Sequence, residues 1–149
     1  MVRPPVIAVV ALAALACSQG LGPNADYVFN RGRWEQRGPA SYAYEFHRGC
    51  FCSSEAIQAV RITVTNGVVT GVVRVDDGQP IPPEQIEQYF RITIDSLFDI
   101  LGAALEDADA VTVQYHPFWG HPTAVAIDYI RNAIDDETSY SAALNFPAP

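Results

Sequence analysis

The sequence predicts an α+β fold in which an antiparallel sheet of about six strands carries its helices on one apolar face. Three observations lead to this prediction. Six short runs alternate apolar and polar residues, which is the period of a half-buried strand. Asn66-Gly67 separates two of these runs, as in a tight hairpin. One segment, residues 93–106, instead repeats its apolar residues at helical spacing.

The chain from Asn24 to Arg37 predicts a short N-terminal helix, because Gly38-Pro39 behind it is a strong C-terminal stop. Tyr27 and Trp34 are seven residues apart and would share one face of this helix. Residues 41–48 then alternate as a strand whose inward side chains are aromatic: Tyr42, Tyr44 and Phe46.

The hairpin is the clearest local signal in the chain. A two-residue loop at Asn66-Gly67 needs positive φ at both positions. It pairs Thr65 with Val68 and, by continuation, Thr63 with Thr70. In this register one face of the hairpin collects Val60, Ile62, Val64, Val69, Gly71, Val73 and Val75.

The main helix follows a loop over 76–83 and a brief helical turn that Pro83 opens. Thr93 is the expected N-cap, and Asp95 lies in the first turn, where a negative charge is favourable. The helix runs from about 93 to 106, and its apolar stripe consists of Ile94, Leu97, Phe98, Leu101 and Leu105.

Two further alternating runs, 111–115 and 125–129, complete the second half of the sheet together with a last strand. A loop from His116 to Pro122 joins them, and an acidic turn over 132–137 precedes the last strand. That strand should point Tyr140, Ala142, Leu144 and Phe146 inward.

The N-terminus predicts export. Residues 1–16 combine one arginine, an apolar run and small residues before Cys17, the layout of a lipoprotein-type signal peptide. Cys17 is the expected lipidation site, 17–23 a short tether, and 24–149 one domain. An ordinary cleaved signal and a retained anchor are the alternatives. The 14 residues from Pro4 to Cys17 reach only about 21 Å, less than a bilayer core of roughly 30 Å. We therefore expect a domain outside the cytoplasm, held on the cell membrane or outer membrane by an N-terminal lipid.

The charge balance excludes several classes of partner. The chain has 17 acidic and 9 basic residues; without Arg3 the mature part has 17 and 8, a net charge of −9. This argues against nucleic acid and against electrostatic attraction to anionic lipid head groups. Every basic residue is arginine, so Schiff-base and lysine-base chemistry is excluded. No cofactor motif is present, and we expect none.

Cys50 and Cys52 form an even pair in an exported, oxidising setting once Cys17 is lipidated. Residues two apart on an extended strand have Cα atoms about 6.6 Å apart, which is long for a disulfide. Closing the pair therefore requires a bend. A local structural staple or two packed thiols, a redox pair, and a metal site are the three interpretations. Strand parity turns His47 away from the pair, which weakens the third.

The loop over 116–122 is the candidate partner-binding loop, with His116, Phe118, Trp119 and His121 as its chemically distinctive residues. Exposed aromatic side chains on a loop mark interaction sites, although the same side chains could fold back over the sheet edge. The two histidines flank the loop and could approach each other. No third ligand accompanies them, so we expect solvated histidines and no metal site.

Several landmarks together resemble an uncharacterised family of exported bacterial lipoproteins that carry a domain of unknown function. The landmarks span Trp34 to about Phe146: Tyr42-Ala43-Tyr44, Cys50-Phe51-Cys52, residues 93–98 (Thr-Ile-Asp-Ser-Leu-Phe), Tyr115, residues 120–123 (Gly-His-Pro-Thr), Ile127-Asp128 and Asp135-Asp136-Glu137. Both His116 and His121 depart from the residues usual in that family. The resemblance implies a fold and a cellular address, and it brings no assigned activity.

These observations favour a lipid-anchored cell-envelope protein that is a non-catalytic binding or structural module. Its partners would be the membrane, through the lipid, and an envelope protein or small ligand. The alternative is a thiol-redox or metal-binding envelope protein that uses Cys50 and Cys52.

Overall fold

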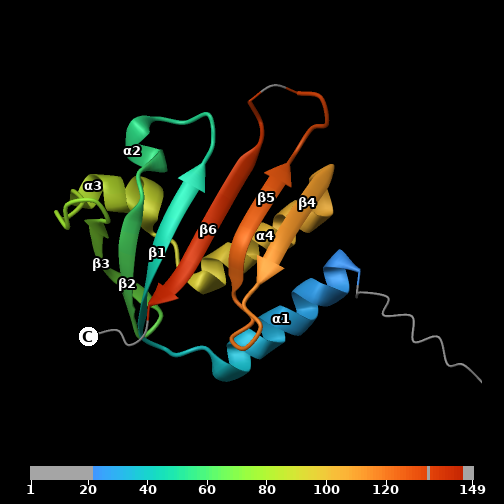
Figure 1. The fold of residues 1–149 in the computed structure, drawn as a ribbon, viewed down its shortest axis with the longest axis horizontal. Coiled ribbons are helices and arrows are strands. Elements are labelled where there is room, and N and C mark those ends of the chain that lie inside the picture. Colours follow the sequence, from blue (N-terminus) through green and yellow to red (C-terminus); the bar gives the residue numbers. More distant parts are fainter. Residues whose placement is uncertain (1–21, 134, 146–149) are drawn as a thin grey trace, which may run out of the picture.

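The structure is a computed structural model that describes residues 22–133 and 135–145 (Figure 1). Its helices are α1 (Pro23–Arg37), α2 (Ser54–Ile57), α3 (Pro83–Gln85), the π-helix η1 (Ile86–Phe90) and α4 (Ile94–Asp107). Its strands are β1 (Tyr42–Gly49), β2 (Val60–Thr65), β3 (Val68–Arg74), β4 (Ala110–Tyr115), β5 (Pro122–Asp128) and β6 (Thr138–Asn145). The expected signal peptide, Cys17 and Phe146 lie outside the described residues.

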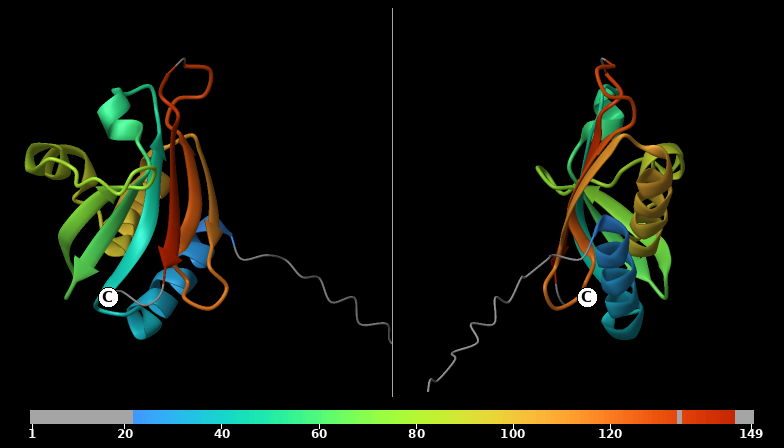
Figure 2. Two further views of the ribbon diagram at one scale, coloured as in Figure 1. Left: turned by 60° about the vertical axis from the view of Figure 1, so that its left-hand side comes forward. Right: turned by 90° about the vertical axis from the view of Figure 1, so that its right-hand side faces the viewer.

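The predicted α+β fold is confirmed. All strand pairings in the six-stranded sheet are antiparallel, in the order β3-β2-β1-β6-β5-β4, so the first and last strands of the chain meet at its centre. Figure 2 shows α1 and α4 on the same side of the sheet. In the described part of the chain, none of the helices has both the length and the apolar character needed to span a bilayer.

The aromatic face of β1 forms the centre of the core, as its alternation predicts. Tyr44 and Phe46 are fully buried, and their rings pack edge to face with centroids 6.2 Å apart. The Tyr44 hydroxyl donates a hydrogen bond to the Ile92 carbonyl (2.6 Å), and the Tyr42 hydroxyl accepts one from the Ile94 amide (2.9 Å). Because these polar atoms are paired, tyrosine can be buried here, and β1 thereby positions the start of α4.

The hairpin turn forms as predicted, but the register beyond it differs. Asn66 and Gly67 have φ values of 50° and 77°, and Thr65 pairs with Val68. A bulge then makes Thr63 pair with Gly71, so Thr70 is the extra residue. One additional residue reverses which side chains of the strand face inward.

The prediction that Val73 and Val75 point into the core is therefore wrong. Val72 occupies the inward position and is 3% exposed, whereas Val75 is 40% exposed.

The main helix has the predicted cap. The Thr93 hydroxyl accepts a hydrogen bond from the Ser96 amide (3.1 Å), and the Ser96 hydroxyl accepts one from the Thr93 amide (3.2 Å). This reciprocal pair is a capping box. The apolar stripe is buried as expected up to Leu101, but at its end Ala104 is fully buried and Leu105 only partly.

Candidate functional site

The loop between β4 and β5 is held against α1. Arg33 donates a side-chain hydrogen bond to the Pro117 carbonyl, and Arg37 donates one to the Phe118 carbonyl (3.1 Å). Gly120, with φ of 81°, brings its backbone so close to the helix that a Cβ at this position would lie 2.5 Å from the Asn30 carbonyl oxygen. Glycine is required here by both conformation and space.

This loop brings His116 and His121 together. Their rings stack with centroids 5.1 Å apart and an interplanar angle of 16°, and the His116 amide donates to the His121 carbonyl (2.8 Å) at the base of the loop. The expectation that both histidines are solvated is wrong for His121, which is 1% exposed. The ring of Trp34, on α1, packs edge-on against His121 with centroids 5.8 Å apart.

The hydrogen bonds of His116 define its tautomer. Its Nδ1 accepts from the backbone amides of Phe118 (3.2 Å) and Trp119 (3.1 Å). An acceptor nitrogen carries a lone pair, so the proton of the neutral ring is on Nε2. His116 therefore offers a donor at Nε2 and has no second lone pair with which to bind a metal.

His121 is in the opposite situation, because neither ring nitrogen has a hydrogen-bond partner among the described residues. Removal from water, with a smaller contribution from the neighbouring His116, lowers its pKa to about 4. The ring is thus neutral near pH 7 and has one donor and one acceptor. Leaving both unpaired typically costs about 1–3 kcal/mol for each buried group.

A hollow of about 310 Å³ lies between this loop and the end of β6. It forms because β5 pairs with β6 only as far as Ala124 and Ser141, whereas β6 continues to Asn145 beside β1. Its lining combines the two histidines with apolar and small side chains: His116, Trp119, His121, Thr123, Ser141, Ala142, Ala143 and Leu144. Such a mixture is suited to a small ligand with an apolar body and a polar group.

Phe118 and Trp119 differ in exposure. The Phe118 side chain is 55% exposed and Trp119 is half-buried; their rings pack perpendicular with centroids 4.7 Å apart. The guanidinium carbon of Arg37 lies 5.2 Å from the centroid of the Phe118 ring. The four predicted loop residues are thus neighbours, but only Phe118 presents a largely open aromatic surface.

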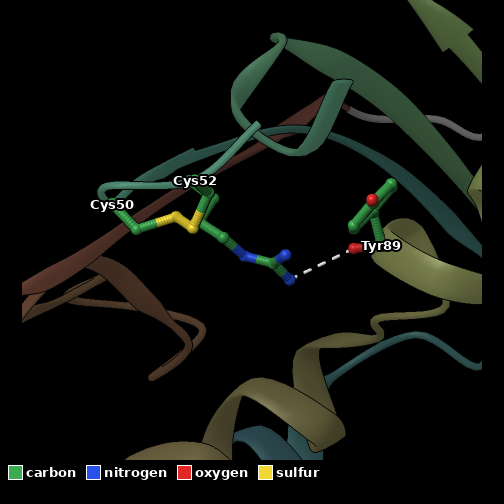
Figure 3. The surroundings of a disulfide bond; sticks show 4 residues. Cys50, Cys52 and Tyr89 are labelled. Carbon is green, nitrogen blue, oxygen red and sulfur yellow. Dashed lines mark hydrogen bonds between the residues drawn. A yellow bond between two sulfur atoms is a disulfide. The ribbon is translucent and has the colours of Figure 1, made fainter. Parts of the chain in front are cut away.

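Cys50 and Cys52 form a disulfide at the end of β1 (Figure 3). Their Cα atoms are 5.3 Å apart because the chain bends at Cys50 and Phe51, as closure of the pair requires. Phe51, inside the ring, is 83% exposed. Beneath the bend, Arg48 donates a hydrogen bond to the Tyr89 carbonyl (3.1 Å), which ties β1 to η1.

The metal-binding alternative would need Cys50 and Cys52 as thiolates, but the two are joined in a disulfide. Among residues 22–133 and 135–145, no group of three or more His, Cys, Asp or Glu side chains is arranged to hold a metal ion.

The sequence patterns did not single out Arg33 and Arg37, which attach the loop to α1. Their spacing of four residues in a chain without lysine was the available signal. Thr123 and Leu144 also line the hollow, and no local pattern indicated that they would meet the histidines.

Neither a curated protein nor a solved structure matches the chain. A protein-family model matches residues 26–145, which includes both the histidine pair and the disulfide. The chain therefore belongs to the family of unknown function DUF6174.

Proposed function

We propose that this protein is a lipid-anchored module of the cell envelope that binds a small, uncharged polar ligand in the hollow beside His116 and His121. The observation that carries the binding role is His121, a buried residue that lines the hollow and whose two ring nitrogens have no partner among the described residues. Buried polar atoms normally have partners, so an unpaired pair of nitrogens beside a hollow favours a ligand that completes them.

The chemistry of the lining favours a neutral amide or a similar group. Neutral His121 needs one acceptor and one donor, and His116 offers Nε2–H. A carboxamide supplies both functions and is not repelled by the net charge of −8. Trp119 and Leu144 would contact the apolar part of such a ligand.

Titration of the full chain with hexanamide tests this proposal. We expect backbone amide shifts in nuclear magnetic resonance spectra to be confined to residues 116–123 and 141–144, and to disappear in His121→Phe. His47→Phe is the matched control because His47 is exposed on β1. Shifts that persist in His121→Phe, or no shifts at all, would contradict the proposal.

The anchoring role is supported by the N-terminal sequence, in which Cys17 directly follows the small residues that end an export signal. Labelling of cells with radioactive palmitate tests it. Wild type should incorporate the label and remain with the membrane fraction, and Cys17→Ala should lose both properties. If Cys17→Ala retains both, Cys17 is not the anchor.

A thiol-redox role is the second candidate, and it is favoured by the exposure of Cys52 in the Cys50–Cys52 disulfide, in which Cys50 is partly buried. The reduction potential of the pair distinguishes a redox role from a purely structural one. A value below about −300 mV indicates an inert staple, whereas one between about −200 and −120 mV indicates a disulfide that exchanges with cellular thiols.

A further inference from the structure

The outer face of α1 gathers two arginines that no carboxylate neutralises. Arg33 and Arg37 lie one helical turn apart, and neither forms an ion pair with an acidic side chain of the described residues. The guanidinium carbon of Arg33 lies 4.5 Å from the ring centroid of Phe29, and that of Arg37 lies over Phe118.

Apolar side chains surround these two charges. Val28, Phe29 and Phe118 are 67%, 52% and 55% exposed. We call Val28, Phe29, Arg33, Arg37 and Phe118 the α1 patch. It combines two cations that pair with no described carboxylate with exposed aromatic and aliphatic groups, although the protein as a whole is acidic.

A hollow of about 330 Å³ lies within the α1 patch, and none of its lining residues is acidic: Val28, Phe29, Gly32, Arg33, Gln36 and Arg37. Glycine is unfavourable inside a helix, yet apart from the residues next to it and the surrounding helix backbone no described atom lies within 4 Å of where a Cβ of Gly32 would be. The two acidic residues of α1 lie outside this lining, and Glu35 is paired with Arg31 (3.2 Å). The hollow is therefore open and locally positive.

The position of the α1 patch along the chain indicates what it contacts. If Cys17 carries a lipid, as proposed above, Gly22 lies only five positions after the anchor, and α1 begins at the next residue. Five extended residues reach at most about 18 Å. A tether this short keeps α1 at the surface of the bilayer.

We propose that the α1 patch docks on anionic phospholipid. Head-group phosphates occupy the hollow between Arg33 and Arg37, and Phe29, Phe118 and Val28 enter the interfacial layer. One guanidinium group can bind two oxygens of a phosphate at once, and aromatic side chains favour the membrane interface. The net negative charge does not prevent this, because at physiological salt charges act over only about 8 Å.

Hydrogen–deuterium exchange on the full chain, purified with its N-terminal modification and mixed with vesicles, tests the proposal. The vesicles contain phosphatidylcholine alone or phosphatidylcholine with phosphatidylglycerol. We expect residues 28–37 to exchange more slowly when phosphatidylglycerol is present. Each arginine near an anionic surface strengthens docking about fivefold, so replacing both by glutamine should weaken it about 25-fold.

Two further variants separate charge from folding. The double variant Arg33→Lys with Arg37→Lys keeps both charges and should retain most of the protection. If the double glutamine change acted only by loosening the β4–β5 loop, the lysine variant would lose the protection as well. Arg91→Gln with Arg131→Gln makes the same change in net charge away from α1 and should behave as wild type. Protection that is equal in both vesicle types, or that survives the double glutamine change, overturns the proposal.

Flotation of the chain with the vesicles reports the anchor separately. A chain that floats without phosphatidylglycerol-dependent protection supports the anchor and refutes docking. A chain that stays in solution with phosphatidylcholine vesicles, but floats and shows this protection when phosphatidylglycerol is present, refutes the anchor and supports docking. A chain that shows neither refutes both.

Discussion

His121 combines deep burial with a titratable ring. Because the folded state disfavours the charged form, its pKa falls from 6.5 to about 4, and the unfolded chain binds more protons in between. The stability that depends on neutral His121 is therefore complete above pH 6.5 and is lost as the pH falls toward 4. A shift of this size corresponds to about 3 kcal/mol.

We predict that acidification from pH 7 to pH 4 lowers the free energy of unfolding of the wild type by about 3 kcal/mol more than that of His121→Phe. Phenylalanine fills a similar space and has no ring nitrogens to charge. Urea unfolding at a series of pH values measures the difference, and carboxylates titrate equally in both proteins. Parallel pH profiles would show that folding does not lower the pKa of His121.

Gly120 sets how closely the β4–β5 loop approaches α1. We predict that Gly120→Ala lowers the free energy of unfolding by more than the 1–2 kcal/mol expected for positive φ alone. An added Cβ would lie 2.5 Å from the Asn30 carbonyl oxygen and 2.9 Å from the Arg33 Cβ. Gly67→Ala is the matched control, since Gly67 also has positive φ but faces open space. Equal losses in urea unfolding would contradict this account.

At the scale of one element, α4 depends on its capping box. We predict that Thr93→Ala lowers the free energy of unfolding by about 1 kcal/mol, because the Ser96 amide loses its acceptor at the N-terminus of the helix. Thr93→Ser keeps the hydroxyl and should remain close to wild type. Thermal unfolding followed by circular dichroism compares them. If Thr93→Ser lowers the free energy of unfolding as much as Thr93→Ala, the threonine methyl group and not the hydroxyl stabilises the helix.

The strands show how a local pattern can hold at one position and fail at the next. Alternation located β2 and β3, and the turn residues Asn66 and Gly67 set the first pair. The bulge at Thr70 then reversed the inward positions of β3, so that Val72 is buried. The Thr70 hydroxyl lies 3.0 Å from that of Thr65 and donates weakly to the Thr63 carbonyl (3.4 Å). Alternating valines at 73 and 75 gave no sign of this.

At the scale of the whole molecule, α4 connects two apolar clusters. Ile94, Leu97 and Phe98 pack with β1 and β2 residues, and Leu101 and Ala104 pack with β5 residues. One helix thus packs against both halves of the sheet. If either half unfolded, it would expose the apolar side chains of α4 that pack against it, so the two halves should unfold together.

We predict that Leu101→Ala lowers the free energy of unfolding by about 2–5 kcal/mol, since Leu101 is fully buried and its loss leaves a cavity. We also predict one cooperative transition. Tryptophan fluorescence, which reports Trp34 and Trp119, and far-ultraviolet circular dichroism should give the same urea midpoint. Separate midpoints would mean that the two clusters unfold independently.

The sequence alone was enough to predict where the strands lie, the turn at Asn66-Gly67, the cap at Thr93 and the closeness of Cys50 and Cys52. These features depend on neighbours within a few positions, where periodicity and turn chemistry act. The pairing of β1 with β6, the burial of His121 against Trp34 and the α1 patch depend on segments that are distant along the chain. Their contacts form only when the sheet closes and its helices pack, so no local pattern encodes them.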